Sequence, residues 1–230
     1  MLPFDGRRRR PARGARCQSA YGLARAVFNA SIAVLFWLGA AAPAGAAAGN
    51  VPLIVALGDS LTAGYGLAPE QAFPVRLAAY LAARGVKVTI ENAGVSGDTT
   101  AGGRARLDWA LADKPRYAIV ELGANDALRG IDPSEAEANL DAILTALDAR
   151  GVKVLLAGML APPNLGRDYG ATFKAIYPRL AARHHALLYP FFLDGVAGNA
   201  ALTQADGLHP TAAGVDVIVA RIAPYVEKLL

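Results

Sequence analysis

Short apolar segments alternate along this chain with longer segments in which apolar residues recur every three or four positions. The short segments lie at 52–57, 86–92, 117–122, 152–159 and, more weakly, 186–190. Each is a nearly continuous apolar run, a pattern typical of strands that are buried on both faces of a parallel sheet. We therefore expect a five-stranded sheet that is covered by helices on both sides.

The longer segments predict five helices, at 70–84, 99–112, 133–150, 169–184 and 211–228. The third is the clearest, because Asp132 can cap its first turn, Pro133 suits its first position and Gly151 can end it. Strands and helices that alternate in series predict parallel pairing through right-handed crossovers. The pattern therefore favours one α/β domain over 47–230.

The composition suits one such domain, but the charge is unevenly distributed. Of the 230 residues, 54% are hydrophobic, and the formal net charge is +4. Residues 1–46 hold seven arginines and one acid, which leaves 16 basic and 18 acidic side chains in 47–230. A nucleic-acid-binding domain would carry a clustered basic face. We expect no nucleic-acid partner for this slightly acidic domain.

Residues 1–46 have the order of parts found in a secretory signal: an arginine-rich start, an uncharged apolar run near 30–42, and small residues at 44–48. The apolar run is short for a membrane span. We expect a periplasmic or secreted protein with no stable membrane insertion after cleavage; a retained N-terminal anchor is the alternative. The single cysteine, Cys17, lies in this segment, so 47–230 has no thiol for a disulfide or a nucleophile.

Two polar motifs lie far apart in the sequence. Gly58-Asp59-Ser60-Leu61 follows the first predicted strand, and Asp206-Gly207-Leu208-His209 precedes the last predicted helix. Because ligands bind at the carboxyl ends of the strands in open parallel sheets, we expect both motifs at one edge. A serine hydroxyl becomes nucleophilic when a base takes its proton, and a carboxylate can hold that base in one tautomer. The sequence thus predicts a catalytic set of Ser60, Asp206 and His209.

Each motif also has an ordinary structural interpretation. Ser60 can be an N-cap, because serine commonly starts a helix, and His209 can be a loop histidine. The Gly-x-Ser-x-Gly turn of the α/β-hydrolases is absent, because Thr62 occupies the place of its second glycine. We interpret Asp59 as a structural hydrogen-bonding residue.

Acyl transfer through a serine also needs donors for the oxygen that becomes negative in the transition state. Three groups are candidates: the backbone N–H of Ser60, the backbone N–H of Gly94 and the side-chain amide of Asn125, which follow the first, second and third predicted strands. A glycine at position 94 would let the backbone approach a substrate closely. Turn formation is the alternative for Gly94 and Asn125, since both residue types are common in loops.

Taken together, the motifs resemble those of the SGNH (GDSL) hydrolases. The matching residues are Gly58-Asp59-Ser60-Leu61, Gly94, Gly123-x-Asn125-Asp126 and Asp206-x-x-His209. They occur in the family's order and spacing, and the resemblance covers about 52–228. The residues around the first and third motifs are similar to the bacterial periplasmic branch of thioesterases, lysophospholipases and arylesterases.

The resemblance implies a flavodoxin-like three-layer α/β/α fold and hydrolysis of acyl esters and thioesters of small molecules or lipids. It assigns Ser60 as the nucleophile, His209 as the base and Asp206 as the residue that orients the base. It also implies an oxyanion hole formed by Ser60, Gly94 and Asn125. No metal or organic cofactor follows from it.

Two loops at the same predicted sheet edge, 126–131 and 161–169, carry apolar residues. In the related branch the corresponding loops line an acyl groove, whereas ordinary loop packing is the alternative. The candidate substrate-binding residues are Leu128, Ile131, Pro162 and Leu165. We expect a preference for medium-length acyl chains and tolerance for aryl esters.

Two other functions remain open. One is a carbohydrate O-deacetylase or acetyltransferase that uses the same catalytic residues. The other is a flavodoxin-like binding module, although the glycine patterns that cradle phosphates are incomplete here. Acids and histidines do not cluster at metal-ligand spacing, and His184 and His185 suggest a helix-end or surface role. We expect a monomer without a metal.

Overall fold

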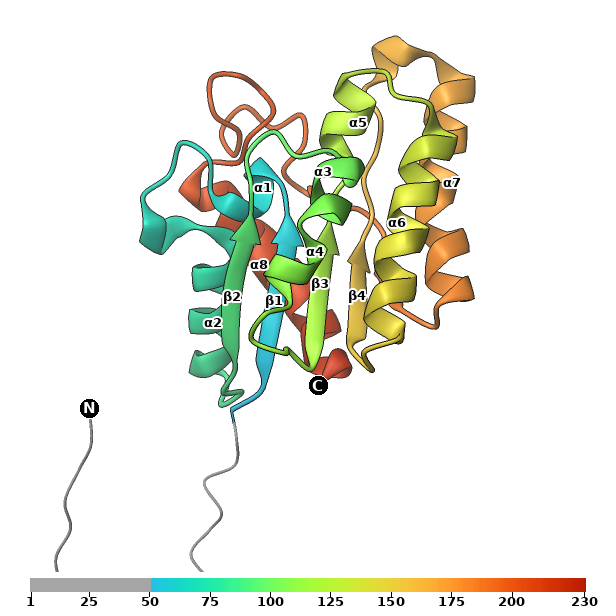
Figure 1. Ribbon diagram of the computed structural model, residues 1–230. Helices are drawn as coiled ribbons and strands as arrows, with labels where there is room; N and C mark the ends of the chain where they lie inside the picture. Colours follow the sequence, from blue (N-terminus) through green and yellow to red (C-terminus); the bar gives the residue numbers. More distant parts are fainter. Residues whose placement is uncertain (1–50) are drawn as a thin grey trace, which may run out of the picture. The chain divides into compact units, whose positions relative to one another are not determined.

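The computed structural model describes residues 51–230 (Figure 1). The predicted targeting segment, 1–46, lies outside the described residues. Five parallel strands form one sheet: β1 (Leu53–Gly58), β2 (Thr89–Gly94), β3 (Tyr117–Glu121), β4 (Lys153–Ala157) and β5 (Leu187–Tyr189). Their order is β2-β1-β3-β4-β5, which is the flavodoxin-like order. The predicted fold class is confirmed.

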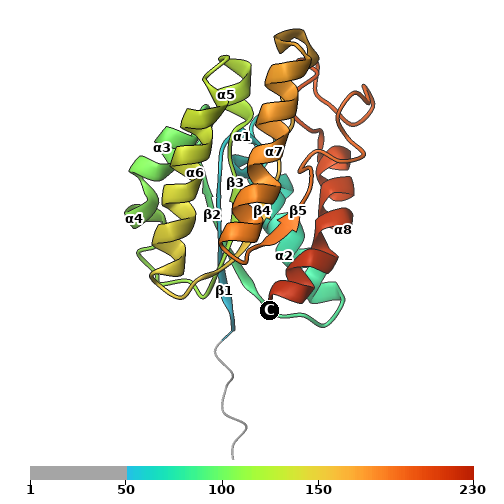
Figure 2. The ribbon, with the colours of Figure 1, turned by 90° about the vertical axis from the view of Figure 1, so that its right-hand side faces the viewer.

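Helices cover both faces of the sheet (Figures 1 and 2). One face carries α3 (Thr100–Ala105), α4 (Leu107–Ala110), α6 (Pro133–Asp148) and α7 (Arg167–Arg183). The other face carries α2 (Phe73–Ala83) and α8 (Ala212–Leu229). Two short helices, α1 (Ser60–Ala63) and α5 (Ala124–Leu128), begin at the carboxyl ends of β1 and β3. Two 3₁₀ turns, Pro69–Gln71 and Pro163–Leu165, complete the described elements.

The strand order reverses between β1 and β3, and this is where open α/β sheets bind their ligands. Strand β1 pairs with β2 on one side and with β3 on the other, so the chain leaves these strands in opposite directions. The side chains that follow β1 and β3 therefore border one crevice at the carboxyl edge of the sheet. Ser60 and Asn125 are among the polar residues at this point.

Most predicted elements are observed within a few residues of their expected bounds, and two differences bear on the site. The predicted strand 86–92 is observed at Thr89–Gly94, where Gly94 is the last residue of β2 and pairs with Gly58. Gly94 therefore belongs to the sheet rather than to the loop after it. The single helix predicted at 99–112 is also wrong, because the chain leaves the helical path at Arg106 (φ −106°, ψ 12°) and forms α3 and α4 instead.

The predicted start of the third long helix is confirmed. The Asp132 carboxylate accepts a hydrogen bond from the Ser134 N–H (2.8 Å), and Pro133 is the first residue of α6. The cap satisfies a donor that has no partner inside the helix, and proline has no N–H to leave unpaired at this position. Gly151 adopts a positive φ of 68° in the turn that leads to β4.

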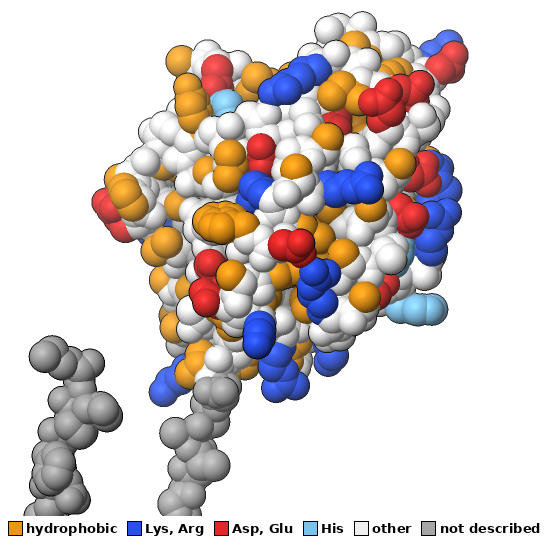
Figure 3. Space-filling model, in the orientation of Figure 1, with side chains coloured by type: hydrophobic (Ala, Val, Ile, Leu, Met, Phe, Trp, Pro, Cys, Tyr) orange, Lys and Arg blue, Asp and Glu red, His pale blue; other side chains and the backbone are white. Residues whose placement is uncertain are grey.

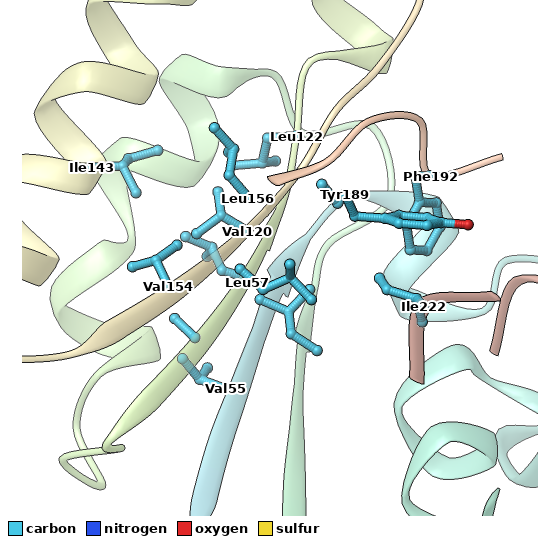
Figure 4. Packing of buried hydrophobic residues seen from close by; sticks show 14 of the residues in the cluster. Val55, Leu57, Val120, Leu122, Ile143, Val154, Leu156, Tyr189, Phe192 and Ile222 are labelled. Atoms are coloured by element: carbon cyan, nitrogen blue, oxygen red, sulfur yellow. The ribbon is translucent and has the colours of Figure 1, made fainter. Parts of the chain in front are cut away.

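The core consists of apolar side chains on both faces of the sheet. Strand residues two positions apart point to the same face, so Val55 and Leu57 pack with Ile143 of α6 on one side (Figure 4). On the other side lie Tyr189 at the end of β5, Phe192 after it, and Ile222, which belongs to α8 (Figure 4). Full burial of a leucine or isoleucine contributes about 1.5–3 kcal/mol relative to exposure. This packing fixes the strands whose ends carry the polar residues.

Within residues 51–230, none of the helices combines the length and the apolar character that a membrane crossing requires.

Candidate active site

Ser60 is the first residue of α1, two residues after the end of β1. A Cβ at Gly58 would lie 2.0 Å from Oγ1 of Thr62, so only glycine lets the chain turn this sharply. The helix is capped by Asp59, whose Oδ1 accepts the Leu61 N–H at 3.0 Å. The N-cap interpretation of Ser60 is therefore wrong, and its hydroxyl is available for another partner.

That partner is His209. The His209 Nε2 atom lies 2.9 Å from Ser60 Oγ, and its Nδ1 atom lies 2.6 Å from Asp206 Oδ2. The other carboxylate oxygen of Asp206 accepts the N–H groups of Leu208 (2.9 Å) and His209 (3.0 Å). The three predicted residues thus form one continuous chain of hydrogen bonds, in which the carboxylate fixes the ring and the free nitrogen faces the hydroxyl.

The same contacts keep Asp206 ionised. The hydrogen bond from the His209 ring, followed by the backbone N–H groups of His209 and Leu208, lowers the pKa of Asp206 to about 2. A carboxylate that accepts several hydrogen bonds favours its charged form. Asp206 therefore stays negative throughout the neutral range, where it can stabilise an imidazolium on His209.

The loop that carries His209 is tied to the loop after α1 by one residue, Gln204. Its backbone N–H donates to the His209 carbonyl (2.7 Å). Its side-chain amide donates to the carbonyls of Tyr65 (2.8 Å) and Pro210 (3.0 Å). A Cβ at Gly66 would lie 2.3 Å from Gln204 Oε1, so the two loops are in close contact. No sequence motif marks Gln204, because its role depends on contacts between distant segments.

Asn125 is the second residue of α5 and borders the same crevice. Its side-chain amide donates to Asp59 Oδ2 (3.1 Å) and to the Asp98 carbonyl (2.9 Å). A Cβ at Gly123 would lie 2.2 Å from the Tyr177 hydroxyl, which explains the glycine before α5. Both amide hydrogens have acceptors in the free protein, so a substrate oxygen would share one of them.

The structure places Gly94 less favourably for the role expected from the sequence. Its N–H donates to Asn92 Oδ1 (3.0 Å), and its Cα faces the backbone of α1, where a Cβ would lie 2.3 Å from the Ala63 nitrogen. Gly97, three residues later, is exposed and has φ +86°. Among the described residues we find no acceptor for the N–H groups of Gly97 and Ser60. Both groups are next in the chain to residues that bind the Asn125 amide, Asp59 and Asp98.

Two buried carboxyl groups lie beneath Ser60. Burial raises the pKa of Asp59 to about 6, although hydrogen bonds from Leu61 and Asn125 oppose the rise. Burial, and then the nearby Asp59, hold the pKa of Glu121 well above its ordinary value. Glu121 is fully buried and accepts the Thr62 hydroxyl at 2.8 Å. Two adjacent buried carboxyls disfavour double ionisation, so Glu121 is the neutral member of the pair.

An apolar cavity of about 390 Å³ opens beside Ser60, Asn125 and His209. Leu128 and Pro162 line it, as expected from the sequence, whereas Ile131 and Leu165 are not among its lining residues. The Ile131 carbonyl instead accepts the Tyr169 hydroxyl at 2.6 Å. The apolar lining residues that sequence reasoning missed include Leu61, Met159, Leu160, Phe191, Leu193 and Leu208.

The missed residues had a usable signal in the sequence. Phe191 and Leu193 follow β5 at the carboxyl edge of the sheet, as Leu128 follows β3 at the same edge. Within 51–230 we find no group of three or more histidine, cysteine or acidic side chains that could hold a metal ion. The arrangement offers a nucleophile, a base, amide donors and an apolar cavity.

The family is shown by comparison with known proteins. Residues 56–217 match the model of the GDSL-like lipase/acylhydrolase family, and this match spans both polar motifs. The chain belongs to this family and is an ester hydrolase that acts through a serine.

Individual relatives agree with this assignment. The chain is 40% identical over 178 residues to the esterase TesA of Pseudomonas aeruginosa, a match that covers 77% of this chain and 89% of the relative. It is 39% identical over 186 residues to thioesterase 1/protease 1/lysophospholipase L1 of Escherichia coli, covering 80% and 87%. Among solved structures, TesA matches with a TM-score of 0.74 at 40% identity, covering 77% of this chain and 99% of that one. The SGNH-hydrolase family esterase AlinE4 matches with a TM-score of 0.67 at 49% identity, covering 79% and 98%.

Proposed function

We propose that Ser60, His209 and Asp206 catalyse the hydrolysis of acyl esters and thioesters through an acyl-enzyme. The observation that carries this proposal is the unbroken chain of hydrogen bonds from Asp206 through His209 to Ser60 Oγ, at 2.6 and 2.9 Å, beside an apolar cavity. A serine whose only role is to cap a helix does not require an imidazole that is oriented by a carboxylate. The names of the relatives, esterase and thioesterase among them, support the same class of reaction.

The reaction consists of two acyl transfers. His209 Nε2 takes the proton of Ser60 as Oγ attacks the substrate carbonyl, and Asp206 stabilises the imidazolium that forms. The imidazolium then protonates the leaving alcohol or thiol, which departs and leaves the acyl group on Ser60. A water molecule, deprotonated by the same His209, attacks the acyl-enzyme, and the imidazolium returns the proton to Ser60 Oγ as the acid leaves.

The negative charge that develops on the carbonyl oxygen requires fixed donors. The Ser60 N–H and the Asn125 amide are the donors that we assign to this role. Gly94, the third donor expected from the sequence, would first have to give up its hydrogen bond to Asn92. The N–H of Gly97, whose neighbour Asp98 binds Asn125, is the better-supported third donor.

The cavity favours a substrate with an apolar acyl group longer than acetyl. Leucine, methionine, phenylalanine and proline side chains form much of its wall, and its volume of about 390 Å³ falls in the range of small-molecule sites. A sugar O-acetyl ester would leave most of this surface unfilled. We therefore expect a preference for medium-length acyl chains, with aryl and thiol leaving groups accepted.

The test uses p-nitrophenyl esters of increasing chain length together with an acyl-thioester. Ser60→Ala and His209→Ala should each lower kcat by several orders of magnitude, because triad residues act as a unit. A fluorophosphonate probe should label the wild type strongly. It should label His209→Ala only weakly and Ser60→Ala not at all. Wild-type activity in Ser60→Ala, or a rate maximum at the acetyl ester, would contradict the proposal.

We also propose that 47–230 is a single exported domain that acts as a monomer, and that 1–46 is the segment that directs its export. The order of arginines, apolar residues and small residues in 1–46 supports this part. N-terminal sequencing of the protein recovered from periplasm and medium tests the cleavage. Sedimentation equilibrium tests the monomer.

A further inference from the structure

Arg106 connects two loops of the active site without lying in it. Its Nε atom donates to Asp98 Oδ2 at 2.6 Å, and its Nη2 atom donates to the Gly58 carbonyl at 2.8 Å. The side chains of Arg106 and Asp98 are each only 17% exposed. A guanidinium presents several donors in one rigid plane, so it can hold a carboxylate and a carbonyl at a fixed separation.

Both acceptors of Arg106 lie next to residues with a proposed catalytic role. Gly58 is the last residue of β1 and precedes the turn Asp59-Ser60. The backbone carbonyl of Asp98 accepts the Asn125 side chain at 2.9 Å. Arg106 therefore bridges the turn that carries the nucleophile and the loop that holds the amide donor.

The local fold is adapted to this contact. The chain departs from helical geometry at Arg106, between α3 and α4, where a continuous helix was predicted. Gly102 brings α3 close to the ion pair, since a Cβ there would lie 2.7 Å from Asp98 Oδ1. Gly103 lets α3 approach the end of β3, since its Cβ would lie 2.3 Å from a Leu122 methyl group. The helix break and both glycines thus lie in one short segment, residues 102–106.

We propose that Arg106 is a positioning residue for the oxyanion hole: it fixes the distance between the Ser60 N–H and the Asn125 amide. The inference rests on the proposed function of those two groups. Arg106 acts on the Ser60 turn through the Gly58 carbonyl and on Asn125 through Asp98. Catalytic groups displaced by about 1 Å can lose roughly 10²-fold in rate, so a modest shift of this bridge should be measurable.

The chain offers a matched control in Arg150. Its guanidinium also binds one carboxylate, Asp108 (2.6 Å), and one backbone carbonyl, Ala146 (2.8 Å). Arg150 follows α6 and precedes β4, at the amino edge of the sheet and away from the crevice. Its replacement removes a similar pair of contacts without touching either active-site loop.

The experiment compares kcat, KM and thermal midpoint for p-nitrophenyl butyrate in five variants of the purified protein. They are Arg106→Ala, Arg106→Lys, Arg150→Ala, Asn125→Ala and the double variant Arg106→Ala/Asn125→Ala. Arg106→Ala should lower kcat by about 10–100-fold with KM changed much less. The kcat of Arg106→Lys should lie between those of the wild type and Arg106→Ala, because an ammonium cannot hold both acceptors in one plane. Arg150→Ala should leave kcat unchanged.

The double variant separates positioning from general stability. If Arg106 acts through Asn125, then Arg106→Ala should lower kcat by less than about 3-fold once Asn125 is alanine, because the two effects are coupled. Additive losses in the double variant, or a kcat in Arg106→Ala equal to the wild type, would overturn the proposal. Should Arg106→Ala not fold, Asp98→Asn carries the same expectations, since it removes the ion pair and keeps the Asp98 carbonyl.

Ser60→Ala, measured alongside, keeps the two proposals distinct. Activity that persists in Ser60→Ala would contradict the proposed function itself. Activity that depends on Ser60 but is unaffected by Arg106→Ala would contradict only the role of Arg106.

Discussion

The ring of Tyr65 lies against the imidazole of His209, with ring centroids 4.6 Å apart and planes inclined by 39°. Tyr65 is 53% exposed, so core packing does not explain the contact. Its backbone is fixed instead by Gln204, which donates to the Tyr65 carbonyl at 2.8 Å. The proposed base is thus held by Asp206 at Nδ1 and covered by an aromatic face.

An aromatic face beside the base should assist the step in which His209 becomes positive. A cation over an exposed ring gains roughly 0.5–1 kcal/mol, which corresponds to about 2–5-fold in rate. We predict that Tyr65→Leu lowers kcat by this factor, whereas Tyr65→Phe keeps the wild-type rate. Steady-state kinetics on one p-nitrophenyl ester measure it. Equal losses in both variants would assign the role to the hydroxyl instead.

Replacement of Asp206 by asparagine should remove the charge but keep the size of the side chain. An asparagine at this position can donate to His209 Nδ1, which would place the ring in the wrong tautomer for accepting the Ser60 proton. We predict a loss of roughly 10³–10⁴-fold in kcat for Asp206→Asn. Asp194→Asn, at a surface carboxylate paired with Arg221, is the control and should keep full activity.

The same substitution should change the dependence of stability on acid. The pKa of Asp206 is lowered to about 2 from an ordinary value of 3.8, so its ionised form stabilises the folded state above pH 3.8. That contribution is lost as the pH falls through the folded-state pKa near 2. The side chain is 37% exposed, so solvent screens the interaction and the effect should be small. Urea unfolding should show a constant difference from Asp206→Asn between pH 8 and 4, and a shrinking one below.

The sequence predicted the sheet and the hydrogen-bonded set well, for a physical reason. Buried parallel strands need continuous apolar runs, and residues after such strands must meet at one edge. The sequence therefore predicts Ser60, His209 and Asn125 at the crevice, where the structure has them. Gly94 was placed less well, because the end of β2 is set by its pairing with β1 rather than by its own residues.

The remaining differences arise from contacts between distant segments. The helical pattern of 99–112 does not predict the break at Arg106, because the break accompanies hydrogen bonds from this side chain to Asp98 and Gly58. Likewise, Leu165 is apolar and belongs to a loop predicted at the catalytic edge of the sheet. The cavity is nevertheless lined by Phe191 and Leu193 and not by Leu165. Which apolar loop residues meet a cavity depends on how each loop folds back over the edge.

The cavity predicts a chain-length effect at Leu128. This side chain lines the cavity and is 49% exposed, so it is free to cover an acyl chain. Leu128→Ala removes three outer carbons against which an acyl chain would pack. Each CH₂ of the substrate that is no longer buried there costs about 0.8 kcal/mol of binding. We predict that Leu128→Ala lowers kcat/KM about 5–10-fold for an octanoyl ester and less than about 2-fold for an acetyl ester.

Leu165 provides the comparison for this test, because the sequence placed it in the groove and the structure places it outside the cavity lining. Leu165→Ala should leave the ratio of octanoyl to acetyl rates unchanged. A ratio that falls equally in both variants would restore the groove expected from the sequence and move the acyl chain toward the 3₁₀ turn Pro163–Leu165.

A row of ion pairs joins α6 to α7, where blue and red side chains alternate on the right of Figure 3. In this row His184 bridges two carboxylates: Nδ1 lies 2.6 Å from Asp148 Oδ2, and Nε2 lies 2.8 Å from Asp141 Oδ1. Arg183 also binds Asp141, at 2.8 Å. The His184 side chain is 9% exposed, so the charged bridge is partly shielded from water.

This bridge predicts a stability difference that depends on pH. Burial alone would lower the pKa of His184, but the hydrogen bonds to Asp141 and Asp148 outweigh it and raise the pKa above its ordinary 6.5. The stabilisation is therefore complete below pH 6.5 and is lost as the pH rises through the folded-state pKa. At pH 5.5 the thermal midpoint of the wild type should exceed that of His184→Gln. Each kcal/mol that the bridge adds to the free energy of unfolding corresponds to roughly 2–4 °C. The difference between the two midpoints should narrow by pH 9. His185→Asn is the control, since asparagine tolerates the positive φ of 51° there, and a pH-independent gap for His184→Gln would contradict the charged bridge.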